Sequence, residues 1–242
     1  TPPAPVQERG ETQTLSTVWR IMAERTTQSW TNVPHFFLLR EVNASRLVSW
    51  RESLSKKWDA ETQELASGGK ITYTDLLIRV AAAALLRNPA INAAWQDGTI
   101  IRQPGIHIGL ATAQENGLVV PVIHDVDRMS LRQIALARTE LVQRARAGRL
   151  RPQDLTGGTF TISNLGMYGV DAFIAIINSP QAAILTVGRI SERVTAVKGL
   201  PMVQPMLTLS LSCDHRVVDG VRGAQFLDTI AGFIEEPASL VD

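Results

Sequence analysis

The hydrophobic period of the sequence changes from that of a strand to that of a helix close to position 215. From Leu207 to Ser212, large apolar residues alternate with small polar ones, which predicts a half-buried strand. From Gly220 onward, apolar residues recur at helical spacing. Between them, the run Ser212-Cys213-Asp214-His215-Arg216-Val217-Val218-Asp219-Gly220 places a histidine between carboxylates, with Asp219 as the expected N-cap. The chain must therefore fold so that a sheet strand meets a helix at His215, where rigid elements can aim one side chain.

The rest of the pattern predicts one α+β domain. Helices are expected at residues 14–32, 45–58, 74–88 and from 131 onward, and strands at 35–42, 106–113, 118–124, 158–164, 182–198 and 206–213. The helix at 74–88 is nearly all apolar and belongs in an interior or an interface. Residues 1–13 are Pro-rich and fit the end of a linker, which leaves residues 14–242 as the domain.

Composition narrows the class of protein. With 24 basic and 23 acidic residues the formal charge is +1, so no basic footprint predicts nucleic-acid binding. No apolar run approaches the roughly 18 residues of a membrane span, and no targeting segment is visible at Thr1. The single cysteine, Cys213, excludes an intrachain disulfide, and no Cys/His cluster predicts a metal site. On the helix from 131, Arg138, Arg144 and Arg146 are expected to be solvated.

Five blocks of the sequence resemble, in the same order, the dihydrolipoamide acyltransferases that form the cores of 2-oxo acid dehydrogenase complexes. These blocks are residues 33–36, 117–122, 154–166, 176–185 and 214–220. The last contains His215-x-x-x-Asp219-Gly220, which also resembles the signature of chloramphenicol acetyltransferase. The resemblance covers about residues 20–241 and makes residues 14–242 an acyltransferase catalytic domain. It implies an α+β fold of the chloramphenicol acetyltransferase type, with a mixed β-sheet and helices packed on one side.

The resemblance also assigns catalytic roles. His215 is the expected general base, and Ser163, 52 residues earlier, the expected oxyanion donor. Asp219 is expected to organise the loop, and Asp214 and Arg216 to pair around the turn. A thiol has a pKa of about 8.5 and a histidine of about 6.5, so a positioned imidazole can accept the proton of an attacking thiol. His35 and His107 are expected to be structural or pocket-lining, and Cys213 fits the outward alternation of its strand rather than a nucleophile.

Carried over residue by residue, the resemblance implies a channel for CoA. Its expected lining is Ser163, Asn164, Met167, Gly188 and Ile190, with Arg9 and Ser29 as further contacts near the N-terminus. Met167 departs from the small residue often found at its position. The lipoyl group that carries the acyl substrate belongs to a separate domain, which is not expected within this chain.

The expected partners follow from the same family. Copies of the chain are expected to form trimers with the active site between neighbours, and trimers to assemble into cores of 24 or 60 subunits. The apolar segment 78–86, which needs extensive covering, agrees with such contacts. A lipoyl domain and the decarboxylase and dihydrolipoamide dehydrogenase components would be the other partners. The compartment would be the bacterial cytoplasm or the mitochondrial matrix.

Three functions stay open. The leading one is transfer of an acyl group, with acetyl the closest match, from S-acyl-dihydrolipoamide to CoA; branched-chain and succinyl groups remain alternatives. The second is a non-catalytic, core-building protein of the same fold, although this chain retains His215 and Ser163. The third is a hydrolase that uses Ser163, Asp171 and His215. It is disfavoured because no Gly-x-Ser-x-Gly elbow surrounds Ser163.

Overall fold

A mixed β-sheet forms the centre of the protein in a computed structural model that describes residues 14–62, 70–114 and 117–240. Its strand order is β1-β11-β9-β8-β4-β7, and β10 pairs with the first half of β11, from Leu200 to Met206. β8 runs parallel to β4 and β9, and the other pairs are antiparallel. The strands are β1 (His35–Asn43), β4 (Ile108–Leu110), β7 (Val122–Ile123), β8 (Phe160–Asn164), β9 (Ala183–Val187), β10 (Ser191–Val197) and β11 (Leu200–Asp214).

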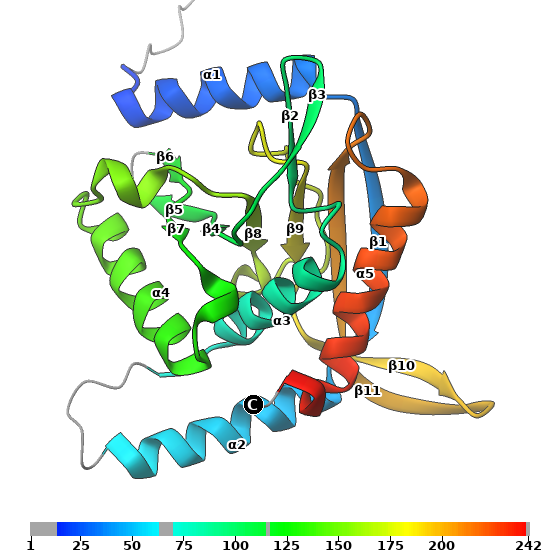
Figure 1. The fold of residues 1–242 in the computed structure, drawn as a ribbon. Coiled ribbons are helices and arrows are strands. Elements are labelled where there is room, and N and C mark those ends of the chain that lie inside the picture. Colours follow the sequence, from blue (N-terminus) through cyan, green and yellow to red (C-terminus); the bar gives the residue numbers. More distant parts are fainter. Residues whose placement is uncertain (1–13, 63–69, 115–116, 241–242) are drawn as a thin grey trace, which may run out of the picture.

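Helices cover one face of this sheet and its two ends. α3 and α5 lie side by side in front of the sheet with α4 next to them, while α1 and α2 cross opposite ends (Figure 1). The helices are α1 (Thr17–Asn32), α2 (Ser45–Thr62), α3 (Tyr73–Arg87), α4 (Leu131–Arg146) and α5 (Gly220–Glu235), with 3-10 turns at η1 (Val126–Arg128), η2 (Pro152–Leu155), η3 (Gly166–Tyr168) and η4 (Pro237–Leu240). The predicted fold class, a mixed sheet with helices packed on one side, is confirmed. Within the described ranges, none of the helices combines the length and the apolar character that a membrane crossing requires.

Helix starts follow the capping chemistry of the sequence. Ser130 caps α4 in a box with Gln133, and Asp219 caps α5 by accepting a hydrogen bond from the Arg222 backbone. α3 begins slightly earlier than predicted, because Thr72 forms its capping box with Asp75. Each cap satisfies backbone N–H groups that a helix start otherwise leaves unpaired.

The apolar helix α3 lies inside this chain and not at a surface between chains. Its residues Leu76, Leu77, Ile78, Val80 and Leu85 are buried in the main core, and only its last large apolar residue, Leu86, is exposed. Of the two places predicted for this helix, an interior or an interface, the structure shows the interior. The helices α4 and α5 and the 3-10 turn η1 contact α3.

Of the three arginines on α4 that were expected to be solvated, Arg146 is exposed, but Arg138 and Arg144 pair with carboxylates. The Arg138 guanidinium lies 2.6 Å from the carboxylate of Asp75, which is fully buried at the start of α3. Arg144 pairs with Glu140 on its own helix and with Asp154, which is also buried. The helical pattern placed these arginines on the polar face of α4, but that face packs partly against buried carboxylates. A buried carboxylate requires such a partner.

Both faces of β11 are buried from Met206 to Asp214, contrary to the half-buried strand predicted from its alternation. Leu209, Leu211 and Cys213 face the core under α5, and Ser210 and Ser212 on the other face are also inaccessible. The segment that precedes β9 covers this second face: the Thr186 hydroxyl donates to the Phe173 carbonyl at 2.6 Å. Cys213 therefore points inward, not outward, and burial raises the pKa of its thiol to about 12.

Three predicted strands are divided in the structure. The segment 182–198 forms β9 and β10, which are separated at Gly188, where a Cβ would lie 1.9 Å from the Asp171 carbonyl oxygen. Lys198 and Gly199 both have positive φ and turn β10 into β11, so β11 begins at Leu200 rather than at 206. The segments 106–113 and 118–124 divide into β4 and β5 (Thr112–Gln114), and β6 (Gly117–Val119) and β7. A further hairpin joins β2 (Ala93–Gln96) to β3 (Thr99–Arg102).

Candidate active site

The backbone around His215 is fixed on both sides of the strand-to-helix junction. The His215 N–H donates to the Pro34 carbonyl at 3.0 Å, which ties the junction to the start of β1. The Val217 and Val218 N–H groups donate to the Asp214 carbonyl at 3.0 and 2.9 Å. Asp219 then caps α5 and pairs with Arg222 at 3.4 Å. His215 thus occupies a turn that is braced by the end of β11 and by the first turn of α5.

Asp214 and Arg216 form the ion pair expected from the sequence. The Asp214 carboxylate is 2% exposed and accepts hydrogen bonds from the Arg216 backbone N–H, Nε and Nη2 at 3.0, 3.0 and 2.8 Å. The guanidinium carbon also lies 5.2 Å from the centre of the Trp95 ring on β2. Arg216 therefore joins the His215 junction to the β2–β3 hairpin, which is a structural role.

The His215 side chain itself is exposed. Its imidazole centre lies 4.5 Å from that of the Phe36 ring, with the two planes inclined at 51°. A solvent-accessible imidazole on a fixed backbone can exchange a proton with a bound thiol, which is the geometry that a general base requires.

Ser163 lies near the other end of the sheet. It is in register with Thr186, and Thr186 is in register with Ser210, so the three side chains form one row across β8, β9 and β11. Asp214 follows Ser210 by four residues along β11. At about 3.3 Å per residue and about 4.8 Å between strands, the Ser163 and Asp214 backbones are about 16 Å apart. Within one chain, His215 and Ser163 do not meet.

The catalytic triad of the hydrolase hypothesis is consequently not formed within one chain. Asp171, its proposed acidic member, pairs with Arg189 at 2.7 Å and with Arg193 at 3.6 Å. Because neither the serine nor the aspartate reaches His215, the arrangement cannot relay a proton from Ser163 through His215 in a single subunit.

Five of the predicted CoA contacts gather around the ends of β8 and β9. Ser163 and Asn164 end β8, Met167 is 70% exposed in η3, and Gly188 and Ile190 follow β9. The Asn164 side chain accepts a hydrogen bond from the Gly166 N–H at 2.9 Å and donates one to the Thr74 hydroxyl at 3.3 Å. These bonds tie the end of β8 to η3 and to α3.

Ser29 lies elsewhere. It is buried on α1, and its hydroxyl donates to the Ile177 carbonyl at 2.6 Å, beside the start of β9. Because Ile177 and His215 both lie at the end of the sheet where β9 begins, Ser29 is placed nearer to the His215 end than to the Ser163 end. Arg9 lies outside the described residues.

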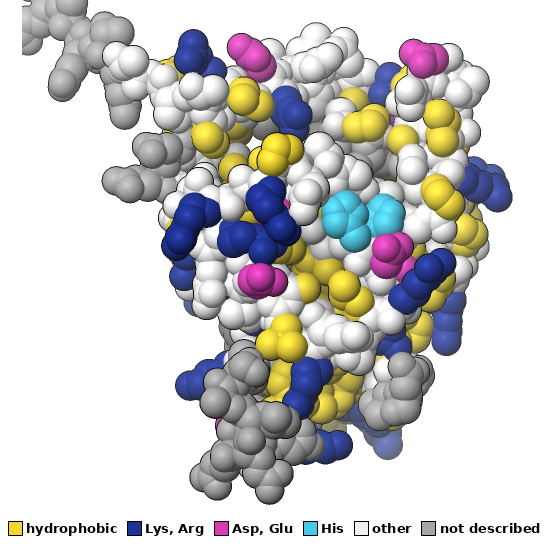
Figure 2. All heavy atoms as spheres, turned by 60° about the vertical axis from the view of Figure 1, so that its left-hand side comes forward, with side chains coloured by type: hydrophobic (Ala, Val, Ile, Leu, Met, Phe, Trp, Pro, Cys, Tyr) yellow, Lys and Arg dark blue, Asp and Glu magenta, His cyan; other side chains and the backbone are white. Residues whose placement is uncertain are grey.

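A pair of histidines forms a second polar cluster away from this junction. Figure 2 shows two adjacent histidine side chains on the face that carries α4; the ring centres of His107 and His124 are 5.1 Å apart. The Asp125 N–H donates to His107 Nδ1 at 2.9 Å, so this nitrogen is unprotonated. Burial and, to a smaller degree, the nearby His124 lower the pKa of His107. His107 is thus a structural acceptor for the backbone, as expected.

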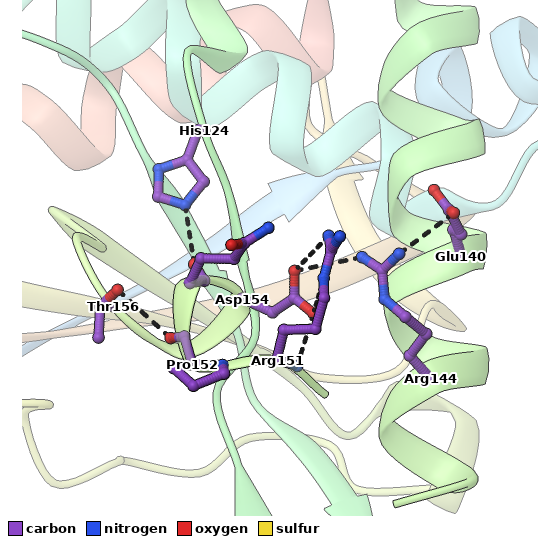
Figure 3. Close-up of polar contacts among 8 residues, drawn as sticks. His124, Glu140, Arg144, Arg151, Pro152, Asp154 and Thr156 are labelled. Carbon is purple, nitrogen blue, oxygen red and sulfur yellow. Dashed lines mark hydrogen bonds and ion pairs between the residues drawn. The ribbon is translucent and has the colours of Figure 1, made fainter. Parts of the chain in front are cut away.

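Asp154 anchors the neighbouring turn. In Figure 3 its carboxylate lies between Arg151 and Arg144, while His124 bonds to the Gln153 carbonyl at 3.3 Å. The Arg151 side-chain hydrogen bond is the main reason why the pKa of Asp154 lies below its ordinary value. The contacts of Asp154 with Arg151 and Arg144 hold η2 against α4. No group of three or more side chains suited to a metal ion gathers within the described part of the chain.

The sequence did not reveal two polar contacts that shape the sheet beside the junction. Thr161 donates to the buried Gln181 at 2.6 Å, which links β8 to the segment before β9. His35 accepts from the Ile177 N–H at 3.0 Å and bonds to the Val33 carbonyl at 2.8 Å. Both contacts join residues far apart in the sequence, and only the paired strands bring them together. The structural role expected of His35 is confirmed.

Comparison with known proteins agrees with this architecture. The family description "2-oxoacid dehydrogenases acyltransferase (catalytic domain)" matches residues 7–241. The chain is 39% identical over 222 residues to the dihydrolipoyllysine-residue acetyltransferase component of the pyruvate dehydrogenase complex of Rickettsia bellii (strain RML369-C), covering 92% of this chain and 52% of that protein. It is 38% identical to component 3 of the mitochondrial complex of Arabidopsis thaliana, covering 93% and 42%. The chain thus spans about half the length, or less, of these relatives.

Solved structures agree as well. A structure of Azotobacter vinelandii dihydrolipoamide acetyltransferase matches with a TM-score of 0.90 at 33% identity and 99% coverage of both chains. The structure of the cubic core of the pyruvate dehydrogenase multienzyme complex matches with a TM-score of 0.88 at 32% identity, also with 99% coverage of both. The chain therefore belongs to the 2-oxoacid dehydrogenase acyltransferase family, and the match covers the catalytic domain of that family.

Proposed function

We propose that this chain transfers an acyl group from S-acyl-dihydrolipoamide to the thiol of CoA, with His215 as general base. The main observation behind this proposal is that the His215 imidazole is exposed, while backbone hydrogen bonds fix the junction on both sides of it. In the Azotobacter vinelandii enzyme, a serine, a histidine and an asparagine were investigated for their roles in the catalytic mechanism; the serine precedes the histidine by 52 residues, and the asparagine follows it by 4. Ser163, His215 and Asp219 have the same separations, which supports their assignment to one site.

The chemistry uses His215 first as a base and then as an acid. The imidazole accepts the proton of the CoA thiol while the sulfur attacks the thioester carbonyl and forms a C–S bond. Ser163 donates a hydrogen bond to the developing oxyanion, which stabilises the negative charge that accumulates there in the transition state. As the tetrahedral intermediate collapses, the original C–S bond breaks and the imidazolium returns its proton to the departing dihydrolipoamide sulfur. Asp219 keeps the junction in place by capping α5.

Two copies of the chain must contribute to this site. Because the Ser163 and Asp214 backbones are about 16 Å apart within one chain and His215 follows Asp214, a serine from a neighbouring copy would have to approach His215. A closed ring of three copies, each repeating the same heterologous contact, supplies three such sites. The similarity to the cubic core of a pyruvate dehydrogenase multienzyme complex supports further assembly of trimers into a core of 24 or 60 subunits.

CoA would lie along the edge formed by the ends of β8 and β9. Ser163, Asn164, Met167, Gly188 and Ile190 lie there, and Ser29 and Arg9 are the further proposed contacts from α1 and the segment before it. The acyl donor would arrive on a lipoyl domain, and the decarboxylase and dihydrolipoamide dehydrogenase components would complete the cycle. The relatives named above occur in a bacterium and in mitochondria, so a bacterial cytoplasm or a mitochondrial matrix is the proposed compartment.

The acyl group is proposed to be acetyl, because the most similar relatives named above are acetyltransferases. The test is a competition assay in which acetyl-, isobutyryl- and succinyl-dihydrolipoamide are offered together and the acyl-CoA products are separated. Acetyl-CoA should dominate. One additional methylene in a pocket changes specificity by about 1–3 kcal/mol, so a preference of at least about tenfold is expected.

The same assay distinguishes the functional classes. Acyl transfer requires CoA and yields acyl-CoA, a hydrolase consumes the thioester without CoA, and a non-catalytic core protein does neither. Equal thioester loss with and without CoA, or no turnover by the assembled protein, would contradict the proposal.

A further inference from the structure

We propose that Phe36 positions the imidazole of His215 for proton transfer, an inference that rests on the proposed role of His215 as general base. The two ring centres are 4.5 Å apart and the planes are inclined at 51°, within the range of favourable aromatic contacts. No hydrogen bond or ion pair of the His215 imidazole is found within residues 14–62, 70–114 and 117–240. In the described chain, the ring contact with Phe36 is therefore what restricts the imidazole.

Phe36 is itself held firmly. It is paired with Cys213 in the β1–β11 ladder, and its side chain lies on the same face of the sheet as those of Cys213 and His215. Beneath it is Gly223 of α5, where an added Cβ would lie 3.6 Å from Phe36 Cζ and 2.8 Å from Leu38 Cδ1. The phenyl ring is thus held by the strand and the helix that meet at the catalytic junction, and it presents a fixed surface to the imidazole.

A fixed surface matters because the His215 backbone is braced while its side chain is exposed. Rotation about the two side-chain bonds of the histidine would carry its nitrogens away from the thiol without any change in the fold. A misplacement of about 1 Å can cost roughly 100-fold in rate. Phe36 is therefore a positioning residue, since it contacts His215 and acts through it.

The neighbouring residue provides a matched control. Phe37 points to the opposite face of β1, where its ring lies 6.1 Å from that of His35. The two phenylalanines lie on the same strand, have the same kind of side chain and are both partly buried. Of the two, only Phe36 contacts His215.

The experiment measures kcat and KM for CoA and for acetyl-dihydrolipoamide in the assembled protein, far below its melting temperature. Phe36→Leu, which keeps an apolar side chain but removes the ring, should lower kcat by about 10-fold or more with KM changed by less than about 2-fold. Phe36→Tyr should retain at least half of the activity because the ring is kept, and Phe37→Leu should do the same.

A double variant separates positioning from general structural support. If Phe36 acts through His215, Phe36→Leu should have almost no further effect in a His215→Ala background, where the base is already missing. An equal further loss in that background, or a normal kcat for Phe36→Leu alone, overturns the inference about Phe36. Full activity of His215→Ala would instead refute the general-base proposal, so the two failures are distinguishable.

Discussion

Ser163 and His215 lie toward opposite ends of one sheet, and the backbone of Asp214, which precedes His215, is about 16 Å from that of Ser163. Their side chains also leave the sheet on opposite sides: Ser163 shares the face of Thr186 and Ser210, while the His215 ring lies against Phe36 on the face toward α5. Two residues placed in this way can cooperate only if different copies of the chain contribute them.

Complementation tests that arrangement directly. His215→Ala and Ser163→Ala proteins, each inactive alone, should recover activity when they are mixed, dissociated and reassembled, because a mixed trimer contains at least one interface with both native residues. Sedimentation mass must show that the mixture has reassembled. Recovery of nothing by assembled mixtures, or full activity of monomers, would place the site within one chain.

His215→Ala should lower kcat by about 10²–10⁴ while CoA affinity changes little. The reason is that the imidazole acts on the thiol proton of CoA and does not bind the rest of that molecule. Steady-state kinetics and calorimetric titration with CoA measure the two effects separately. His124→Ala is a suitable control, because that exposed histidine belongs to the separate cluster near α4. Retention of more than a third of the activity by His215→Ala excludes its role as base.

Ser163→Ala should reduce kcat by roughly 10²–10³ at nearly constant KM, because an oxyanion hydrogen bond is strongest in the transition state. Ser49→Ala on the exposed face of α2 serves as the matched control. A raised KM at unchanged kcat would instead identify Ser163 as an ordinary contact with the bound substrate.

Arg216→Gln should destabilise the fold because it leaves the Asp214 carboxylate, 2% exposed, without its charged partner. The expected loss is about 3 kcal/mol in the free energy of unfolding, or roughly 6–12 °C in melting temperature. Arg40→Gln removes a more exposed ion pair with Asp228 and should cost less than about 1 kcal/mol. Thermal melts at one fixed protein concentration compare the two, and equal shifts would refute the buried-pair argument.

His107 should make stability depend on pH. Burial lowers its pKa in the folded state below 6.5, so the unfolded chain binds more protons as the pH falls below 6.5. Its contribution to stability is therefore fully present above 6.5 and is lost between 6.5 and the lower folded pKa. Protonation of Nδ1 would also remove the acceptor for the Asp125 N–H.

His107→Asn provides the comparison, because an amide oxygen can keep the bond to the Asp125 N–H without titrating. Melting temperatures measured at pH 7.5 and 5.5 should fall more for the native chain than for the variant. Parallel pH profiles of the two proteins would show that His107 does not contribute.

Local physics made several features predictable from sequence. Ser130 and Asp219 cap their helices because short polar side chains satisfy the first backbone N–H groups of a helix, and this chemistry needs no distant partner. The change of period at Gly220 located the junction, whereas Ser163 was paired with His215 through the resemblance to the acyltransferase family. The division of 182–198 was missed because it depends on Asp171, whose carbonyl approaches Gly188 only in the folded chain.

The sequence alone determined the approximate positions of the helices, the strand-to-helix junction at His215 and the residue types available for acyl transfer. Tertiary structure decided that Ser210 and Ser212 are covered, that Arg138 neutralises the buried Asp75, and that Ser163 lies far from His215. Hydrophobic period reports which side of a strand or helix is apolar, but burial depends on what packs on the other side. Distances across a sheet depend on strand order and register, and these are set by contacts between segments that the linear pattern does not connect.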